Sequence, residues 1–106
     1  MEIEIVRVQH AKWGIDGRLY INRKKICDTV EHPTHSKPPG TYTIDLETHP
    51  FRHGDGAMSS RNGEIIVGKQ LMAGVVTQSQ ATYDRLYERL KKAWQRGRKV
   101  KVTIYG

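Results

Sequence analysis

One segment of the chain repeats apolar residues at helical spacing. Leucine and aromatic side chains there share one face of a predicted α-helix: Tyr83, Leu86, Tyr87, Leu90 and Trp94. Ser79 can cap the start of this helix, and Gly97 can supply the left-handed residue that ends it. The pattern therefore predicts one long helix between Ser79 and Gly97, with its apolar stripe packed against the rest of the domain.

Elsewhere apolar and polar residues alternate over short segments, as they do in strands that have one buried face. Strands are predicted for residues 2–9, 18–22, 25–31, 40–46, 64–67 and 99–105. Asn22-Arg23-Lys24 is expected to form the turn of a hairpin over residues 18–31. Gly68 is expected to end the strand of residues 64–67.

Residues 14–17 are expected to form a turn, because Asp16-Gly17 is a strong turn signal. Residues 32–39, with three prolines, and the polar residues 48–62 are expected to be loops. The predicted fold class is α+β: a small, mainly antiparallel curled sheet or open barrel, with one long helix in the C-terminal half of the chain and a final strand.

The length of 106 residues is that of a single domain, expected to span residues 1–106. The first residues lack the pattern of a signal peptide, and no stretch has the apolar length of a membrane span. We therefore expect a cytoplasmic protein without a membrane span. Cys27 is the only cysteine, so no internal disulfide can form.

The chain is basic, with 18 Lys and Arg against 11 Asp and Glu and a net charge of +7. Such a charge favours an anionic partner, such as nucleic acid, phospholipid or an acidic cell-wall polymer, or it serves solubility alone. Four basic residues fall on one side of the predicted helix: Arg85, Arg89, Lys92 and Arg96. They form either an anion-binding face or a solvated face, on which Asp84 and Glu88 can pair with them.

A polar strand face is the second candidate site, since Cys27, Thr29 and Glu31 alternate along one predicted strand. A nucleophilic cysteine needs a base nearby, which makes Cys27, Glu31 and a loop histidine such as His53 candidate catalytic residues. The alternative is a buried structural thiol. The histidine pairs at 32 and 35 and at 49 and 53 have spacings that can bind zinc, but they lie in proline-containing loops. We therefore predict neither a metal site nor a cofactor.

The order of several short motifs resembles one family, across residues 12–106. They are Gly17-Arg18-Leu19-Tyr20, Cys27-Asp28-Thr29-Val30-Glu31, Pro39-Gly40-Thr41-Tyr42, Gly63-Glu64-Ile65-Ile66-Val67-Gly68 and Thr82-Tyr83-Asp84-Arg85-Leu86-Tyr87-Glu88-Arg89. The family is the bacterial and phage domain of unknown function numbered 5675, in the form typical of gut Bacteroidetes. It has no settled activity, and its phage members resemble cell-wall L,D-transpeptidases or occur among lysis functions.

Such members carry a histidine-containing stretch and then Gly-Cys-Ile before Val-Gly. The matching segment here is Gly63-Glu64-Ile65, so the resemblance implies that Glu64 replaces the thiol. His53 is the nearest match to the histidine, and Cys27 matches an earlier cysteine of the family. Three hypotheses remain: a non-catalytic, cell-wall- or phage-related binding domain; an anion- or nucleic-acid-binding accessory protein; and an enzyme that depends on Cys27.

Overall fold

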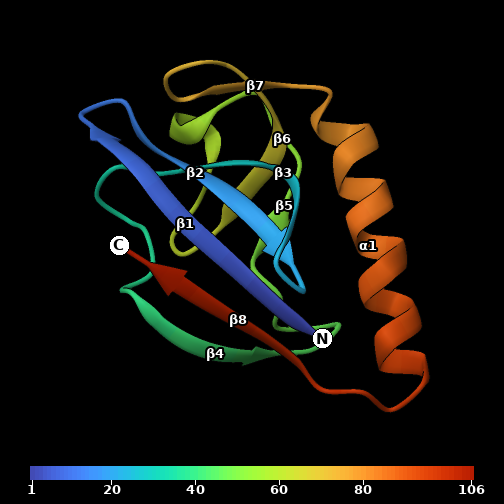
Figure 1. The fold of residues 1–106 in the computed structure, drawn as a ribbon. Coiled ribbons are helices and arrows are strands. Elements are labelled where there is room, and N and C mark those ends of the chain that lie inside the picture. Colours follow the sequence, from blue (N-terminus) through green and yellow to red (C-terminus); the bar gives the residue numbers. More distant parts are fainter.

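Nearly half of the chain forms one curled sheet, seen in a computed structural model that describes residues 1–106. Its strands are β1 (Glu2–Ala11), β2 (Gly14–Ile21), β3 (Lys24–Glu31), β4 (Gly40–Ile44), β5 (Phe51–Arg52), β6 (Ile65–Met72), β7 (Val75–Thr77) and β8 (Val100–Tyr105). The short 3-10 helix η1 (Ala57–Ser59) and one α-helix, α1 (Ser79–Gln95), complete the α+β domain (Figure 1).

The sheet is mixed, in the order β4-β8-β1-β2-β3-β6-β5, with β7 added to β6. Most neighbours are antiparallel, but β1 pairs with β8 in parallel and β5 pairs with β6 in parallel. The expectation of a mainly antiparallel sheet is corrected on this point. Parallel partner strands are joined by long connections rather than by tight turns, so no local turn signal in the sequence predicts their pairing.

Helix α1 packs against β6 and β8, which stand next to opposite ends of the strand order. The sheet must therefore curl so that one helix reaches both strands, and this gives a half-barrel (Figure 1). The main core lies between sheet and helix, with Leu86 and Leu90 of α1 packed into it. A second, smaller cluster joins Val30, Ala57, Ile66 and Val76 on the other side of β3 and β6.

The helix begins and ends close to its predicted limits. Gly97 has φ 71° and ends the helix as expected. The N-cap is Gln78 rather than Ser79, because the Ser79 hydroxyl is used elsewhere. It donates to the carbonyl of Val67 and accepts from the N–H of Gly54, which fixes the start of α1 to the sheet. The helix is neither long nor apolar enough to cross a membrane.

Several predicted loops and ends are different in the structure. Residues 14–17 belong to β2, because the Asp16 carboxylate accepts the Gly74 N–H and Gly17 leaves room for the Thr29 side chain. Segment 48–62 contains β5 and η1. Gly68 does not end its strand: it lies inside β6, where a Cβ would come within 2.8 Å of the Val76 side chain on β7. The hairpin turn at Asn22-Arg23, with φ of 49° and 71°, is as predicted.

Candidate functional site

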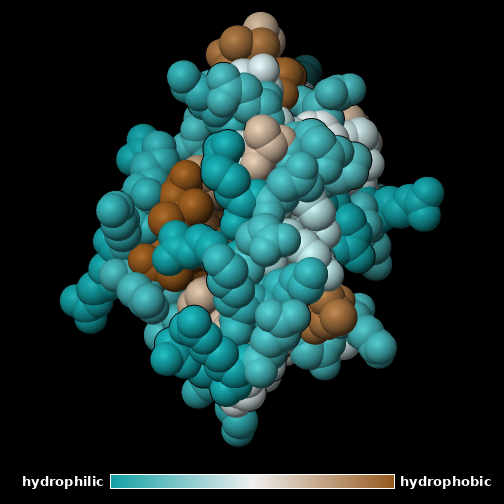
Figure 2. All heavy atoms as spheres, turned by 90° about the vertical axis from the view of Figure 1, so that its right-hand side faces the viewer, coloured by the Kyte–Doolittle hydropathy of each residue, from teal (hydrophilic) through white to brown (hydrophobic).

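One flank of α1 carries a row of basic side chains. The buried face of the helix is set by Thr82, Leu86, Leu90 and Ala93, and the basic row lies beside it. At 3.6 residues per turn, the row spans roughly 60° of the helix circumference and about 16 Å of its length. Its members are all exposed: Arg85, Arg89, Lys92 and Arg96. The face of the molecule that α1 covers is largely hydrophilic, with apolar atoms in separate small patches (Figure 2).

The basic row has no acidic partner. The ion pairs of the structure join Arg7 to Glu31, Lys25 to Asp28 and Arg52 to Glu64. The ion pairs with Asp84 and Glu88 that a solvated face would allow are not formed. Asp84 instead accepts a hydrogen bond from the Gln80 side chain at 2.9 Å. The positive charge of the row stays available to a ligand from solution.

A cleft of about 330 Å³ opens beside the row, between α1 and strands β3 and β6. Lys25, Lys69 and Arg85 bring positive charge to it, and Asp28 brings the one negative charge. The Asp28 carboxylate is already used, since it pairs with Lys25 at 3.0 Å and accepts the Gln70 N–H at 2.9 Å. Partial burial would raise the pKa of Asp28, but these two contacts outweigh it and hold the pKa below its ordinary value. Lys69 and Arg85 are left without a counter-charge.

We call the row together with Lys25 and Lys69 the basic surface. Helical spacing predicts the row, but no pattern in the sequence indicates the two lysines of the cleft. Lys69 was missed because the strand was expected to end at Gly68. Lys25 stood in a predicted strand with no sign that α1 packs next to it.

Cys27 lies in the wall of the same cleft, where it is 8% exposed. Burial, with the charge of Asp28 beside it, raises the pKa of the thiol to about 12. The positive charges of Lys25 and Arg85 act in the opposite direction but do not prevail. A thiol with this pKa is protonated at neutral pH, so it is a poor nucleophile.

Cys27, Thr29 and Glu31 share one face of β3, but they do not form one site. Glu31 lies four positions after Cys27 along the strand, which corresponds to about 13 Å. The Thr29 hydroxyl is buried without a hydrogen-bond partner. His53 is exposed in the segment after β5, with its ring edge-on to Tyr83 at 5.7 Å, and it makes no hydrogen bond to Cys27 or Glu31. The candidate catalytic residues are thus dispersed.

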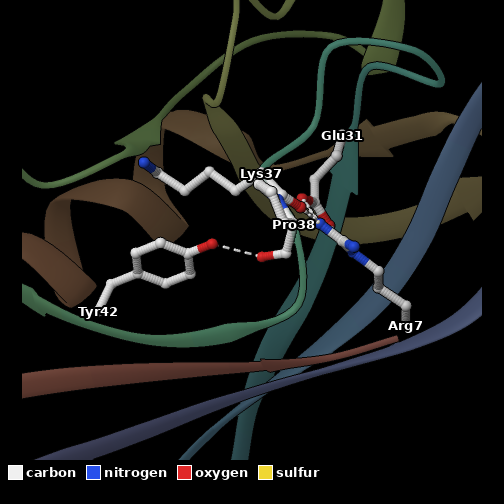
Figure 3. Close-up of polar contacts among 5 residues, drawn as sticks. All are labelled: Arg7, Glu31, Lys37, Pro38 and Tyr42. Carbon is white, nitrogen blue, oxygen red and sulfur yellow. Dashed lines mark hydrogen bonds and ion pairs between the residues drawn. The ribbon is translucent and has the colours of Figure 1, made fainter.

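Glu31 is fully buried and forms a two-pronged ion pair with Arg7 of β1. The guanidinium donates from Nε to Oε2 at 3.1 Å and from Nη2 to Oε1 at 2.8 Å. The same Nη2 donates to the carbonyl of Lys37 at 2.6 Å, so the pair holds the proline-rich segment 32–39 in place (Figure 3). Glu31 therefore has a structural role in this geometry, and nothing in the sequence pointed to Arg7 as its partner.

The histidines do not assemble a metal centre, and no group of three or more His, Cys, Asp and Glu side chains could hold a metal ion. The rings of His32 and His35 lie 4.4 Å apart without a third ligand. His49 is buried among aromatic rings, with centroids 5.9 Å away at Trp94 and 6.2 Å away at Phe51. Burial, assisted by the charge of Arg52, lowers the pKa of His49 below 6.5.

The carboxylate of Glu64 is occupied by contacts with nearby residues. Its carboxylate pairs with Arg52 at 3.3 Å and accepts the Arg61 N–H at 2.7 Å. Comparison of the chain with protein-family models, with curated proteins and with solved structures gives no match.

Proposed function

We propose that this chain is a non-catalytic domain that binds an anionic polymer through its basic surface. The observation that carries the proposal is the lack of counter-charge: of the side chains in that surface, only Lys25 has an acidic partner. A row about 16 Å long meets several charges of a polymer at once, and each neutralised charge releases counterions. The net charge of +7 acts in the same direction over longer range.

Two further observations support a binding role over catalysis. The thiol of Cys27 has a pKa of about 12, so it stays protonated at neutral pH. No histidine is among the neighbouring groups that shift this pKa. Glu64 stands where a catalytic thiol is expected from the family resemblance, and its carboxylate is held by Arg52. These features favour a non-catalytic domain and weigh against an enzyme that depends on Cys27. The resemblance also supports a cell-wall or phage context, in which the anionic polymer would be an acidic cell-wall polymer.

Binding is expected to be weak and insensitive to sequence. The aromatic rings of α1 lie on the flank away from the basic row, where Tyr83, Tyr87 and Trp94 are half-buried beside His49. No aromatic platform is available next to the row for stacking bases. Affinity should therefore come from charge, with a strong dependence on salt.

The test measures binding of fluorescent duplex DNA and of a labelled teichoic acid at salt concentrations from about 50 to about 200 mM. Affinity should fall steeply with salt, and the slope should flatten by up to about one unit for each phosphate that a variant no longer neutralises. The test variant replaces the row with glutamine: Arg85→Gln, Arg89→Gln, Lys92→Gln and Arg96→Gln. A matched control removes as much charge elsewhere on the exposed surface: Lys12→Gln, Arg23→Gln, Lys24→Gln and Arg61→Gln.

The row variant should lose most of the binding while the control keeps it, and both should melt close to the wild type, because exposed charges contribute little stability. No binding of either polymer at about 50 mM salt would reject the proposal. Equal loss in the two variants would also reject it, because net charge rather than this surface would then account for binding. Preference for the wall polymer over DNA would support the cell-wall context.

A further inference from the structure

A second pocket lies between strands β4 and β8 and residues 48–50. It has a volume of about 140 Å³. Its floor is apolar, because Ile44, Val102 and Ile104 turn their buried side chains inward from β4 and β8. Pro50 adds a further apolar wall. The volume is well below the roughly 300 Å³ at which drug-sized sites begin, so only a short ligand fits.

Lys37 is the one charged residue that lines this pocket. Its ammonium lies 5.0 Å from the centre of the Tyr42 ring, and Figure 3 shows the side chain running along that ring. The aliphatic stem also passes close to Gly63, where a Cβ would lie 3.4 Å from the Lys37 Cγ. The Lys37 side chain thus runs alongside Gly63, with its ammonium over the Tyr42 ring and beside the apolar floor.

Hydrogen bonds fix the backbone of Lys37 and the ring of Tyr42. Its carbonyl accepts from Arg7, which is itself held by the buried carboxylate of Glu31. The Tyr42 hydroxyl donates to the carbonyl of Pro38 at 2.5 Å, which fixes the ring beneath the ammonium (Figure 3). A ligand would therefore meet an ammonium that already lies over the Tyr42 ring, which reduces the ordering needed on binding.

The ammonium of Lys37 has no carboxylate partner, and no acidic residue lines the pocket. A cation–π contact attracts the ammonium but leaves its charge uncompensated. An inorganic anion would leave the apolar floor unused, and a neutral hydrocarbon would leave the ammonium unused. A ligand that satisfies both has a short apolar tail and one anionic group.

We propose that this pocket binds small aliphatic carboxylates, with the carboxylate at Lys37 Nζ and the tail on Ile44, Val102 and Ile104. The site goes beyond the proposed polymer binding, because it uses different residues and a different class of ligand. For a ligand with few heavy atoms, the dissociation constant should be on the order of 1 mM.

Amide NMR spectra of the isotope-labelled protein, titrated with hexanoate, test this site. Saturable shifts are expected in β4, in β8 and at residues 48–50. Two ligands serve as controls in the wild-type protein: hexanamide keeps the tail without the charge, and acetate keeps the charge without most of the tail. Each should bind at least about ten-fold more weakly than hexanoate, because each forfeits one of the two interactions.

The matched variants are Lys37→Met and Lys101→Met. Both remove one positive charge, but Lys101 is exposed on β8 between two inward-facing residues and lies outside the pocket. Lys37→Met should weaken hexanoate binding at least about ten-fold, while Lys101→Met should leave it unchanged. Hexanamide binding as tightly as hexanoate, shifts spread over the whole surface, or no saturation would each overturn the proposal. The comparison of hexanoate with hexanamide and acetate uses the wild-type protein. It therefore tests the proposal even if Lys37→Met does not fold.

Discussion

Replacing Arg7 with methionine should destabilise the protein severely, although the change keeps an unbranched side chain of similar length. Arg7 donates two hydrogen bonds to Glu31 and one to the carbonyl of Lys37. The side chains of the pair are 3% and 0% exposed, so water does not replace the missing donors. A buried carboxylate without its partner typically costs about 3–5 kcal/mol. In a domain of this size, each kcal/mol lowers Tm by roughly 4–8 °C.

The double variant Arg7→Met/Glu31→Leu separates the cost of an unpaired charge from the cost of removing hydrogen bonds. With both charges gone, apolar side chains fill the same space, and most of the stability should return. The carbonyl of Lys37 still lacks its donor, which leaves a deficit of about 1 kcal/mol. The double variant should therefore be more stable than Arg7→Met alone.

Urea unfolding, followed by far-ultraviolet circular dichroism, gives the free energies of unfolding. Lys25→Met is the matched control, because it also removes the cation of an ion pair, but the Lys25 side chain is 49% exposed. That control should cost no more than about 1 kcal/mol. If Arg7→Met costs less than about 1 kcal/mol, or if the double variant is no more stable than the single one, the role assigned to the buried pair is wrong.

Leu90→Ala should lower the free energy of unfolding by about 2–5 kcal/mol, because it truncates a core side chain. The control Lys91→Ala, at an exposed position, should lower it by less than about 0.5 kcal/mol. Similar values for the two variants would place Leu90 outside the core. Cys27 should react slowly with Ellman's reagent in the native protein and rapidly in urea, since its thiol pKa is about 12; rapid native labelling would reopen a catalytic role. His49 has a pKa below 6.5 in the folded state. The unfolded chain therefore binds its proton first as the pH falls, so stability should decline below about pH 6.5 and be unaffected above it. Urea melts of wild type and His49→Phe should show this slope only in the wild type, and identical slopes would contradict it.

Local patterns predicted the elements that local forces determine. The helix follows from the spacing of Leu86 and Leu90, and the β2–β3 turn from Asn22-Arg23. Pairings over long distances were not predictable in this way. Neither strand has a local sequence signal for the parallel pairing of β1 with β8. The sequence predicts a strand end at Gly68, but this glycine instead leaves room for the side chain of Val76 on the neighbouring strand.

The candidate sites likewise divide into one that lies within a single element and others that are assembled from distant segments. The basic row on α1 could be found from helical spacing alone, because all four residues belong to one element. The cleft and the Lys37 pocket could not, because each is assembled from separate elements. Arg7 lies 24 residues before Glu31, and a charged residue in a strand normally indicates a solvent-facing position.

The parallel pairing of β1 with β8 also determines when the chain can fold. Glu2 pairs with Lys101, and β4 has β8 as its only strand partner. Bringing such distant segments together carries a larger entropic cost than closing the β2–β3 hairpin, so we expect slow folding for a domain of this length. During synthesis, β1 and β4 keep unpaired edges until residues 100–105 have left the ribosome. We therefore expect the nascent chain to be most prone to aggregation before β8 inserts between β4 and β1, while the edges of these two strands are still unpaired.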